Sequence, residues 1–279
     1  MNSPLKTAFQ VHGTSWVPAN NQNLVVQPLL PPASFIVKRN PQTGQYYLDQ
    51  TESFTVPSKM YGNVPNRADR IMQTFLDRPY QTGVLMTGEK GSGKSMMAKL
   101  LCIKAAELGH PTIIVNQPWT GDGFMQLIQA ITQPAVILFD EFEKVYHERN
   151  DQQELLTMFD GTIQSKKLFV VTCNDVYKID THMMNRPGRM FYKLTYTGLD
   201  EAFIREYCDD NLEANNPSNV DAIVGLSNLF DADRTAFNFD MLKALVEEMN
   251  RYRESTKEAL QLLNISPADN LAQHNYRLS

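Results

Sequence analysis

The sequence Gly83-Val-Leu-Met-Thr-Gly88-Glu-Lys-Gly-Ser-Gly-Lys94-Ser95 joins a short apolar run to a glycine-rich loop, and a helical pattern follows it to Leu108. The glycines allow backbone N–H groups to converge on phosphate oxygens, and the start of the helix adds partial positive charge. The Lys94 ammonium can reach terminal phosphates, and the Ser95 hydroxyl can bind Mg²⁺. A strand before the loop and a helix after it therefore predict a phosphate-binding site. We expect this site to consist of Gly88, Glu89, Lys90, Gly91, Ser92, Gly93, Lys94, Ser95 and Met96.

Short apolar runs alternate with helical patterns over the middle of the chain. Each run has the length of a strand, and continuous apolar character is typical of strands that are covered on both faces. The pattern predicts an α/β fold in which a parallel sheet lies between two layers of helices. The runs are Gly83–Thr87, Thr112–Val115, Ala135–Phe139, Leu168–Thr172 and Phe191–Tyr196.

The N-terminal segment, residues 1–57, differs from the rest in composition. Up to residue 33 it is rich in Asn, Gln and Pro, which favours an extended arm over a packed element. Phe35–Arg39 and Gln45–Leu48 flank a Pro/Gly turn, so this part forms either a small β-hairpin or irregular coil.

After Gly198 the strand pattern ends and amphipathic helical patterns follow, over Asp200–Leu212, Val220–Phe230 and Asp240–Leu263. They predict a helical subdomain of three helices. We therefore divide the chain into the segment 1–57, an αβα nucleotide-binding subdomain at 58–197, the helical subdomain at 198–265 and a polar tail at 266–279.

Polar side chains directly follow two of the apolar runs. Asp140 and Glu141 follow Ala135–Phe139, and Asn174 closes the run that begins at Leu168. Because the carboxyl ends of parallel strands share one edge of a sheet, these groups are expected beside the phosphate-binding loop. Asp140 would hold Mg²⁺ through water, Glu141 would polarise an attacking water, and Asn174 could bind that water or a phosphate oxygen. We expect Glu143 to be a surface charge.

Two arginines follow in Asn185-Arg186-Pro-Gly-Arg189, around a rigid Pro-Gly turn. Guanidinium groups suit phosphate recognition, so Arg186 and Arg189 are candidate phosphate ligands. The alternative is a pair of surface arginines with salt-bridge partners.

The ordered set GEKGSGKS, VILFDE, VVTCN and NRPGR resembles the AAA+ ATPases, and the AAA branch in particular, over about residues 58–265. The resemblance implies strand order 5-1-4-3-2, a helical lid and a ring, usually a hexamer. It also implies that Lys94, Ser95, Asp140 and Glu141 bind and hydrolyse ATP with Mg²⁺, and that Asn174 is sensor 1. Arg186 and Arg189 would be arginine fingers that act on a neighbouring subunit, and Tyr61-Gly62 would contact adenine.

The chain departs from the family at the third helix of the lid, which begins near Asn238-Phe-Asp240 without a sensor-2 arginine. Arg234 is a weak candidate for that role. Trp119-Thr-Gly121 occupies a place similar to the aromatic pore loop of protein-threading rings. Trp119 is therefore either a pore-loop residue that grips an unknown protein substrate or a packed core residue.

Charge and composition limit the function classes. The 279 residues include 26 Lys and Arg against 31 Asp and Glu, a net charge of −5, which disfavours wholesale attraction to nucleic acid or anionic lipid. Three cysteines are too few for a disulfide scaffold or zinc site, and no apolar run is long enough for a membrane helix. We expect a soluble, cytoplasmic AAA+ ATPase that remodels or disassembles a protein partner. The alternatives are a nucleic-acid motor or loader, and an ATP-regulated assembly scaffold.

Overall fold

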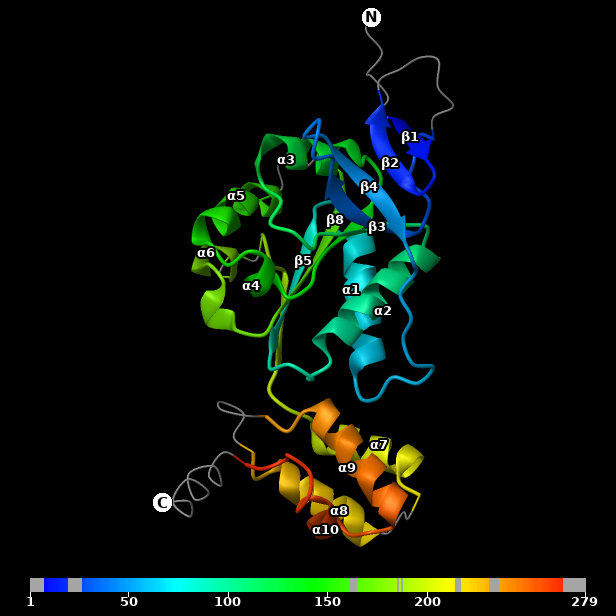
Figure 1. Ribbon diagram of the computed structural model, residues 1–279, viewed down its shortest axis with the longest axis vertical. Helices are drawn as coiled ribbons and strands as arrows, with labels where there is room; N and C mark the ends of the chain where they lie inside the picture. Colours follow the sequence, from blue (N-terminus) through cyan, green and yellow to red (C-terminus); the bar gives the residue numbers. More distant parts are fainter. Residues whose placement is uncertain are drawn as a thin grey trace, which may run out of the picture. The chain divides into compact units, whose positions relative to one another are not determined.

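A computed structural model of the chain describes residues 8–19, 27–160, 165–184, 186, 188–213, 217–230 and 236–267. The chain divides into two compact units (Figure 1). The first comprises residues 1–57, 66–87 and 95–194, and the second comprises residues 58–65, 88–94 and 195–279.

A parallel sheet forms the centre of the first unit. From one edge inward its strands run in the order β9-β5-β8-β7-β6, and the pairs β5–β8, β8–β7 and β7–β6 are parallel. By position along the chain this is the order 5-1-4-3-2, which confirms the predicted fold class. The strands are β5 (Thr82–Gly88), β6 (Thr112–Ile114), β7 (Ala135–Phe139), β8 (Lys167–Cys173) and β9 (Tyr192–Tyr196).

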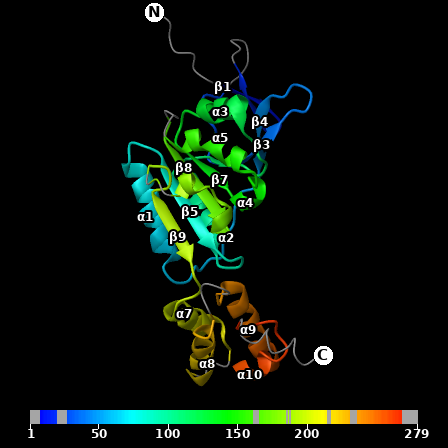
Figure 2. The same cartoon turned by 90° about the vertical axis from the view of Figure 1, so that its left-hand side faces the viewer.

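Helices cover both faces of this sheet (Figures 1 and 2). Helices α3, α4 and α5 pack their apolar side chains against one face, where Phe124, Tyr146 and Phe159 join a core with Phe139 and Phe169. Helices α1 and α2 lie on the other face. The helices are α1 (Val64–Asp77), α2 (Lys94–Glu107), α3 (Gly121–Ala130), α4 (Phe142–Val145), α5 (Arg149–Phe159), η1 (Val176–Lys178) and α6 (Thr181–Met184).

Four N-terminal strands extend the sheet beyond β6. β3 (Ser34–Arg39) pairs in parallel with β6 and antiparallel with β4 (Tyr46–Thr51), which gives a hairpin around the Pro/Gly turn. β2 (Ser15–Ala19) pairs with β4, and β1 (Ala8–His12) pairs with β2, both antiparallel. Residues 8–19, which form β1 and β2, are therefore not part of the extended arm that the composition suggested.

Apolar side chains explain the order of this N-terminal segment. Phe9 and Trp16 are buried, and the Trp16 ring meets Phe35 edge-on at 5.7 Å between centroids. Burying aromatic side chains offsets the entropy of ordering a polar tract. The few aromatic residues of this segment, rather than its average composition, therefore explain why it forms strands.

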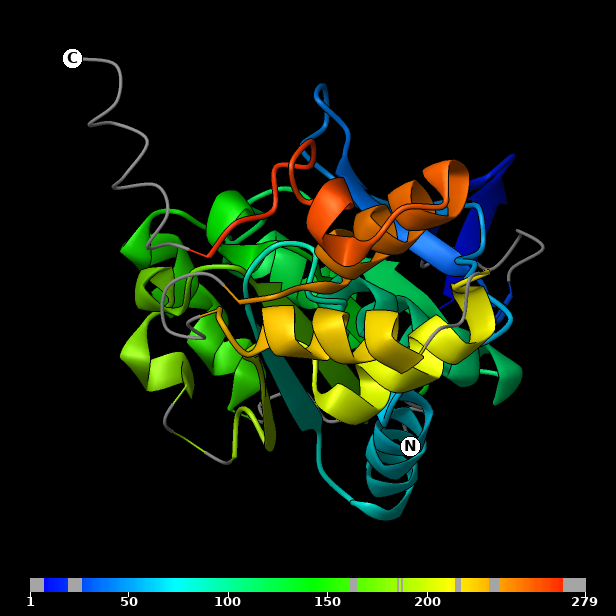
Figure 3. The same cartoon turned by 90° about the horizontal axis from the view of Figure 1, so that it is seen from below.

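The second unit contains a helical bundle built from α7 (Glu201–Asn211), α8 (Pro217–Ser227), α9 (Phe239–Tyr252) and α10 (Thr256–Ala259) (Figure 3). Its core includes Ile204, Ile223 and Leu245. The expected helix 240–263 is broken, because Arg253 adopts a left-handed conformation (φ 55°) and Ser255 starts α10 with a capping box. None of the helices in the described part of the chain has the length and apolar character needed to cross a membrane.

Candidate active site

The glycine-rich loop joins β5 to α2 through a backbone path that side chains would obstruct. Gly88, Gly91 and Gly93 all have positive φ, between 79° and 141°. A Cβ atom at Gly88 would lie 2.4 Å from the carbonyl oxygen of Tyr196, closer than real Cβ contacts allow. The loop conformation therefore requires glycine at these positions, as the sequence pattern predicted.

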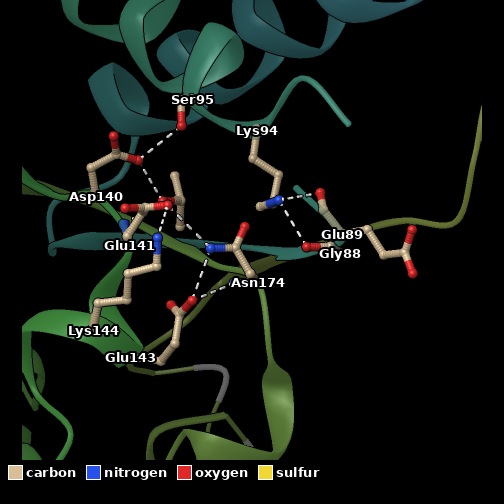
Figure 4. Close-up of polar contacts among 10 residues, drawn as sticks. Gly88, Glu89, Lys94, Ser95, Asp140, Glu141, Glu143, Lys144 and Asn174 are labelled. Carbon is tan, nitrogen blue, oxygen red and sulfur yellow. Dashed lines mark hydrogen bonds and ion pairs between the residues drawn. The ribbon is translucent and has the colours of Figure 1, made fainter. Parts of the chain in front are cut away.

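Lys94 is buried at the start of α2, and its ammonium is surrounded by the loop (Figure 4). Its Nζ donates hydrogen bonds to the carbonyl oxygens of Gly88 (2.8 Å) and Glu89 (2.6 Å), and to Ser92 Oγ (3.3 Å). The positive charge is thus held at a helix N-terminus, where anions bind. Both features suit the phosphates of a nucleotide. Met96, one turn into α2, is half-buried.

The same loop contacts the segment that starts α9, within the second unit. The Glu89 carboxylate accepts a hydrogen bond from the backbone N–H of Ala236 (3.1 Å), and Phe239 N–H donates to Gly91 O (3.2 Å). Asn238 caps α9 and its Nδ2 donates to the carbonyl oxygen of exposed Lys90 (3.4 Å). The start of α9 carries no arginine, and Arg234, the weak candidate, lies outside the described residues.

Asp140 directly follows β7 and lies next to Ser95, the second residue of α2. Its Oδ1 accepts hydrogen bonds from Ser95 Oγ (3.0 Å) and from Thr172 Oγ1 (2.5 Å) (Figure 4). Hydroxyl and carboxylate oxygens are the ligands that Mg²⁺ prefers, so this pair of residues fits the metal that the sequence implied. Sequence reasoning missed Thr172, although a lone hydroxyl in an otherwise apolar run was a usable signal.

Glu141 has an unusual backbone conformation, with φ 51° in the left-handed region. Its N–H donates to Thr172 Oγ1 (2.8 Å), so one hydroxyl holds both carboxylate residues. Its Oε1 accepts from Lys144 Nζ (2.5 Å) and, at a longer 3.4 Å, from Asn174 Nδ2. The bond to Glu141 raises the pKa of Lys144. A strained non-glycine residue held by its surroundings is typical of a functional site.

Asn174 follows β8 and lies between two carboxylates (Figure 4). Besides its contact with Glu141, its Nδ2 donates to Glu143 Oε1 (2.9 Å), and its backbone N–H donates to the same oxygen (3.1 Å). Glu143 is only 5% exposed, so the expectation that it is a surface charge was wrong. Helix α4 turns this side chain inward, toward the end of β8.

The two arginines differ sharply in their surroundings. Arg186 is exposed, whereas Arg189 is buried and pairs with Asp160 at the end of α5. Arg189 Nη2 donates to Asp160 Oδ2 (2.5 Å) and Nη1 donates to the carbonyl oxygen of His182 (2.6 Å). The bond to Arg189 lowers the pKa of Asp160. A guanidinium held in this way within its own chain does not fit a group that reaches into a neighbouring subunit.

Tyr61 and Gly62 lie against helix α7 in the second unit. The Tyr61 ring meets Tyr207 edge-on at 5.0 Å, and its hydroxyl accepts a hydrogen bond from Asn211 Nδ2 (2.8 Å). Gly62 N–H donates to Glu206 Oε2 (2.9 Å). The expected adenine-contact segment is therefore attached to the helical bundle.

Of the two alternatives for Trp119, a pore-loop residue or a packed residue, the structure shows the packed one. Its Nε1 donates to the carbonyl oxygen of Val37 in β3 (3.2 Å), and its own carbonyl oxygen accepts from the Tyr146 hydroxyl (2.9 Å). The indole is half-buried against the main core and meets Tyr46 edge-on. The N-terminal hairpin, which sequence reasoning did not connect with Trp119, supplies the contacts from Val37 and Tyr46.

The central part of the chain is similar to a known protein family. A family model described as "ATPase family associated with various cellular activities (AAA)" matches residues 84–198. This range contains all but the first residue of the apolar run before the loop, the loop itself, the Asp140–Glu141 turn, Asn174 and both arginines. The N-terminal strands and all four helices of the bundle lie outside it.

Several curated proteins are similar over longer stretches. A cell division cycle ATPase of Plasmodium falciparum is 26% identical over 206 residues, 67% of this chain and 16% of that protein. The ATP-dependent zinc metalloprotease FtsH of Heterosigma akashiwo is 24% identical over 192 residues, 60% of this chain and 28% of that protein. The 26S proteasome regulatory subunit 6A of Encephalitozoon cuniculi is 26% identical over 135 residues, which are 41% of this chain and 33% of that protein.

The chain thus spans a third or less of the length of each of these relatives. The part of this chain that the family model covers contains the glycine-rich loop, the acidic residues after β7 and the parallel strands β6 to β8. On this sequence similarity, residues 84–198 match the AAA family of ATPases, and the chain is similar to AAA ATPases over its central part.

Proposed function

We propose that this protein hydrolyses ATP with Mg²⁺ in a ring of identical subunits and uses the reaction to remodel or disassemble a protein partner. The observation that carries the proposal is the row of hydrogen bonds from Ser95 through Asp140 to Thr172, beside Glu141 and Asn174. It joins the start of α2 to the carboxyl ends of β7 and β8, where ligands bind in parallel sheets.

Five residues of the site have a chemical task in this proposal. Lys94 binds phosphate oxygens, and Ser95 and Asp140 hold the metal ion directly or through water. Bound Mg²⁺ would neutralise charge on the phosphates. Glu141 accepts a proton from the attacking water, and Asn174 orients that water or a phosphate oxygen.

The ring is supported by Arg186, whose side chain is exposed and lies in the loop that Arg189 anchors. An exposed arginine beside an anchored turn can act on a phosphate bound by a neighbouring copy, and such arginines contribute about 10³–10⁵-fold to phosphoryl transfer. We assign the intersubunit role to Arg186 and a supporting role to Arg189.

A protein partner is favoured over nucleic acid by the net charge of −5 and by similarity to a proteasome regulatory subunit. Because Trp119 is packed against the N-terminal hairpin, we do not assign it to gripping that partner. Stimulation of ATP turnover by unfolded proteins would support this choice. Salt-sensitive stimulation by DNA or RNA instead would support the nucleic-acid motor.

The central chemical test is Glu141→Gln. The amide keeps the shape of the side chain but cannot accept the proton, so we expect unchanged ATP binding and a loss of turnover of roughly 10²–10⁴-fold. A nucleotide-binding titration and a phosphate-release assay measure the two effects. Glu148→Gln, at an exposed glutamate that begins α5, is the matched control and should behave as the unchanged protein. Wild-type turnover in Glu141→Gln would remove Glu141 from the reaction.

A further inference from the structure

Glu143 is a buried carboxylate that the proposed reaction does not yet use. It lies in α4, two residues after Glu141, and is 5% exposed. Its Oε1 accepts both hydrogen bonds from Asn174, and its Oε2 is buried without a hydrogen-bond partner among the described residues. None of the ion pairs found in the described part of the chain involves Glu143. Burying a carboxylate in this way is costly, and its two bonds from Asn174, together with a contact to the Cys173 thiol, whose pKa burial and Glu143 both raise, offset part of the cost.

The two bonds have different consequences. The bond from the Asn174 backbone N–H ties the end of β8 to α4, as any structural contact would. The bond from Nδ2 additionally determines which end of the side-chain amide faces the carboxylates. An amide group has donors at its nitrogen and acceptors at its oxygen, so only the nitrogen fits between Glu143 (2.9 Å) and Glu141 (3.4 Å).

We propose that Glu143 is a positioning residue that holds the Asn174 amide with its nitrogen toward Glu141. This inference rests on the proposed function, because it concerns the reaction assigned to Glu141. With Glu143 in place, one N–H of the amide is bound and the other faces Glu141 Oε1, on the side where the attacking water is activated. Without Glu143 the amide can rotate and present its oxygen to the Glu141 carboxylate. The donor is then lost, and two acceptors repel each other.

Turnover of a double-mutant set tests this coupling. Glu143→Leu removes the acceptor while filling a similar volume, and we expect it to lower kcat about 10–100-fold, the range for losing an orienting partner in metal sites. ADP affinity should not change. In an Asn174→Ala background the same substitution should have no further effect, because Glu143 acts through Asn174. Full activity of Glu143→Leu, or an equal loss in both backgrounds, would overturn the inference.

Two further variants guard against a trivial loss of structure. Glu143→Gln keeps the shape and one acceptor oxygen but loses the charge, so we expect a smaller loss than for Glu143→Leu. Glu148→Gln, at an exposed glutamate, should match the unchanged protein. Thermal melting of all variants shows whether each is folded. A folded Glu143→Gln protein with a larger loss than Glu143→Leu would contradict the ordering.

The Asn174 side-chain amide gives a measurement that is independent of turnover. In nitrogen-15 spectra of the nucleotide-free protein, its two proton signals are identified by their absence in Asn174→Ala. We expect them to be slow to exchange, and to move and exchange faster in Glu143→Leu. Unchanged signals would contradict the inference. Failure of the proposed function would instead appear as full turnover in Glu141→Gln, so the two failures are distinguishable.

Discussion

At the end of β7, two neighbouring carboxylates are directed to different tasks by one hydroxyl group. Thr172 Oγ1 donates to the Asp140 side chain and accepts from the Glu141 backbone. Asp140 is thereby turned toward Ser95, and Glu141 is held in a left-handed conformation with its carboxylate near Asn174. This division of roles matches the metal-binding and proton-accepting tasks in the proposed reaction.

Lys167, at the start of β8, is a buried residue with a structural rather than chemical task. Its ammonium donates to the carbonyl oxygens of Ile131 (2.7 Å) and Gln133 (3.1 Å) and to Ser165 Oγ (2.5 Å). Desolvation lowers its pKa from 10.5 to about 7. The unfolded chain therefore binds a proton that the folded chain has released, between about pH 7 and 10.5, and folding becomes more favourable as pH rises through this window.

We predict that Lys167→Met removes this pH dependence. The free energy of unfolding of the unchanged protein should rise, relative to that of Lys167→Met, by up to about 1.4 kcal/mol per pH unit above pH 7. Urea denaturation of both proteins at several pH values measures the difference, in which the other titrating groups cancel. A difference that does not vary with pH would show that Lys167 keeps its proton in the folded state.

At the residue scale, the sequence alone proposed those side chains whose place in the chain follows from a local pattern. Lys94, Ser95, Asp140, Glu141 and Asn174 each lie within or directly after a recognisable run. Thr172 and Glu143 did not follow from pattern, because their roles depend on which strands and helices are neighbours. The register of Phe139 opposite Val171 places Asp140 beside Thr172, and no local rule specifies that register.

At the scale of elements, the loop that carries both arginines is attached at two points, one in the sheet and one at the end of a helix. The Arg189 backbone packs over Gly83 in β5, where an added Cβ would lie 2.0 Å from the Arg189 carbonyl oxygen. Its side chain is held by Asp160 at the end of α5. Exposed Arg186 is thus presented from an anchored turn rather than from a free loop.

We predict that breaking this anchor impairs Arg186 without changing nucleotide affinity. Asp160→Ala should lower both turnover and melting temperature, because it leaves a buried guanidinium with one partner fewer. The double variant Asp160→Ala with Arg189→Met should be no worse than Asp160→Ala alone, since the two residues share one interaction. Fully additive losses in stability and turnover would mean that the two residues act separately.

In the N-terminal strands and the helical bundle, some elements could not be predicted from the sequence. The hairpin formed by β3 and β4 was one of two open alternatives, because a pattern of two short β-prone runs gives no partner strand. Its pairing with β6 in the sheet supplies that partner. The break after α9 depends on the left-handed conformation of Arg253. A glycine at this position would have predicted such a conformation, but an arginine does not.

At the scale of the whole molecule, the central claim is that ATP is hydrolysed between subunits, with Glu141 from one copy and Arg186 from the next. A symmetric ring with head-to-tail contacts repeats this arrangement at every interface. One subunit then cannot complete the reaction by itself, and inactive subunits with different defects can complement each other.

Mixing two inactive variants tests this claim most directly. In an equal mixture of Glu141→Gln and Arg186→Ala subunits, about one quarter of the interfaces combine an intact Glu141 with an intact Arg186. Loss of the arginine alone should cost about 10³–10⁵-fold, so phosphate release at up to a quarter of the unchanged rate would be readily measured. We predict this recovery. No recovery, in rings whose mixed composition is established by native mass spectrometry, would contradict an active site shared between subunits.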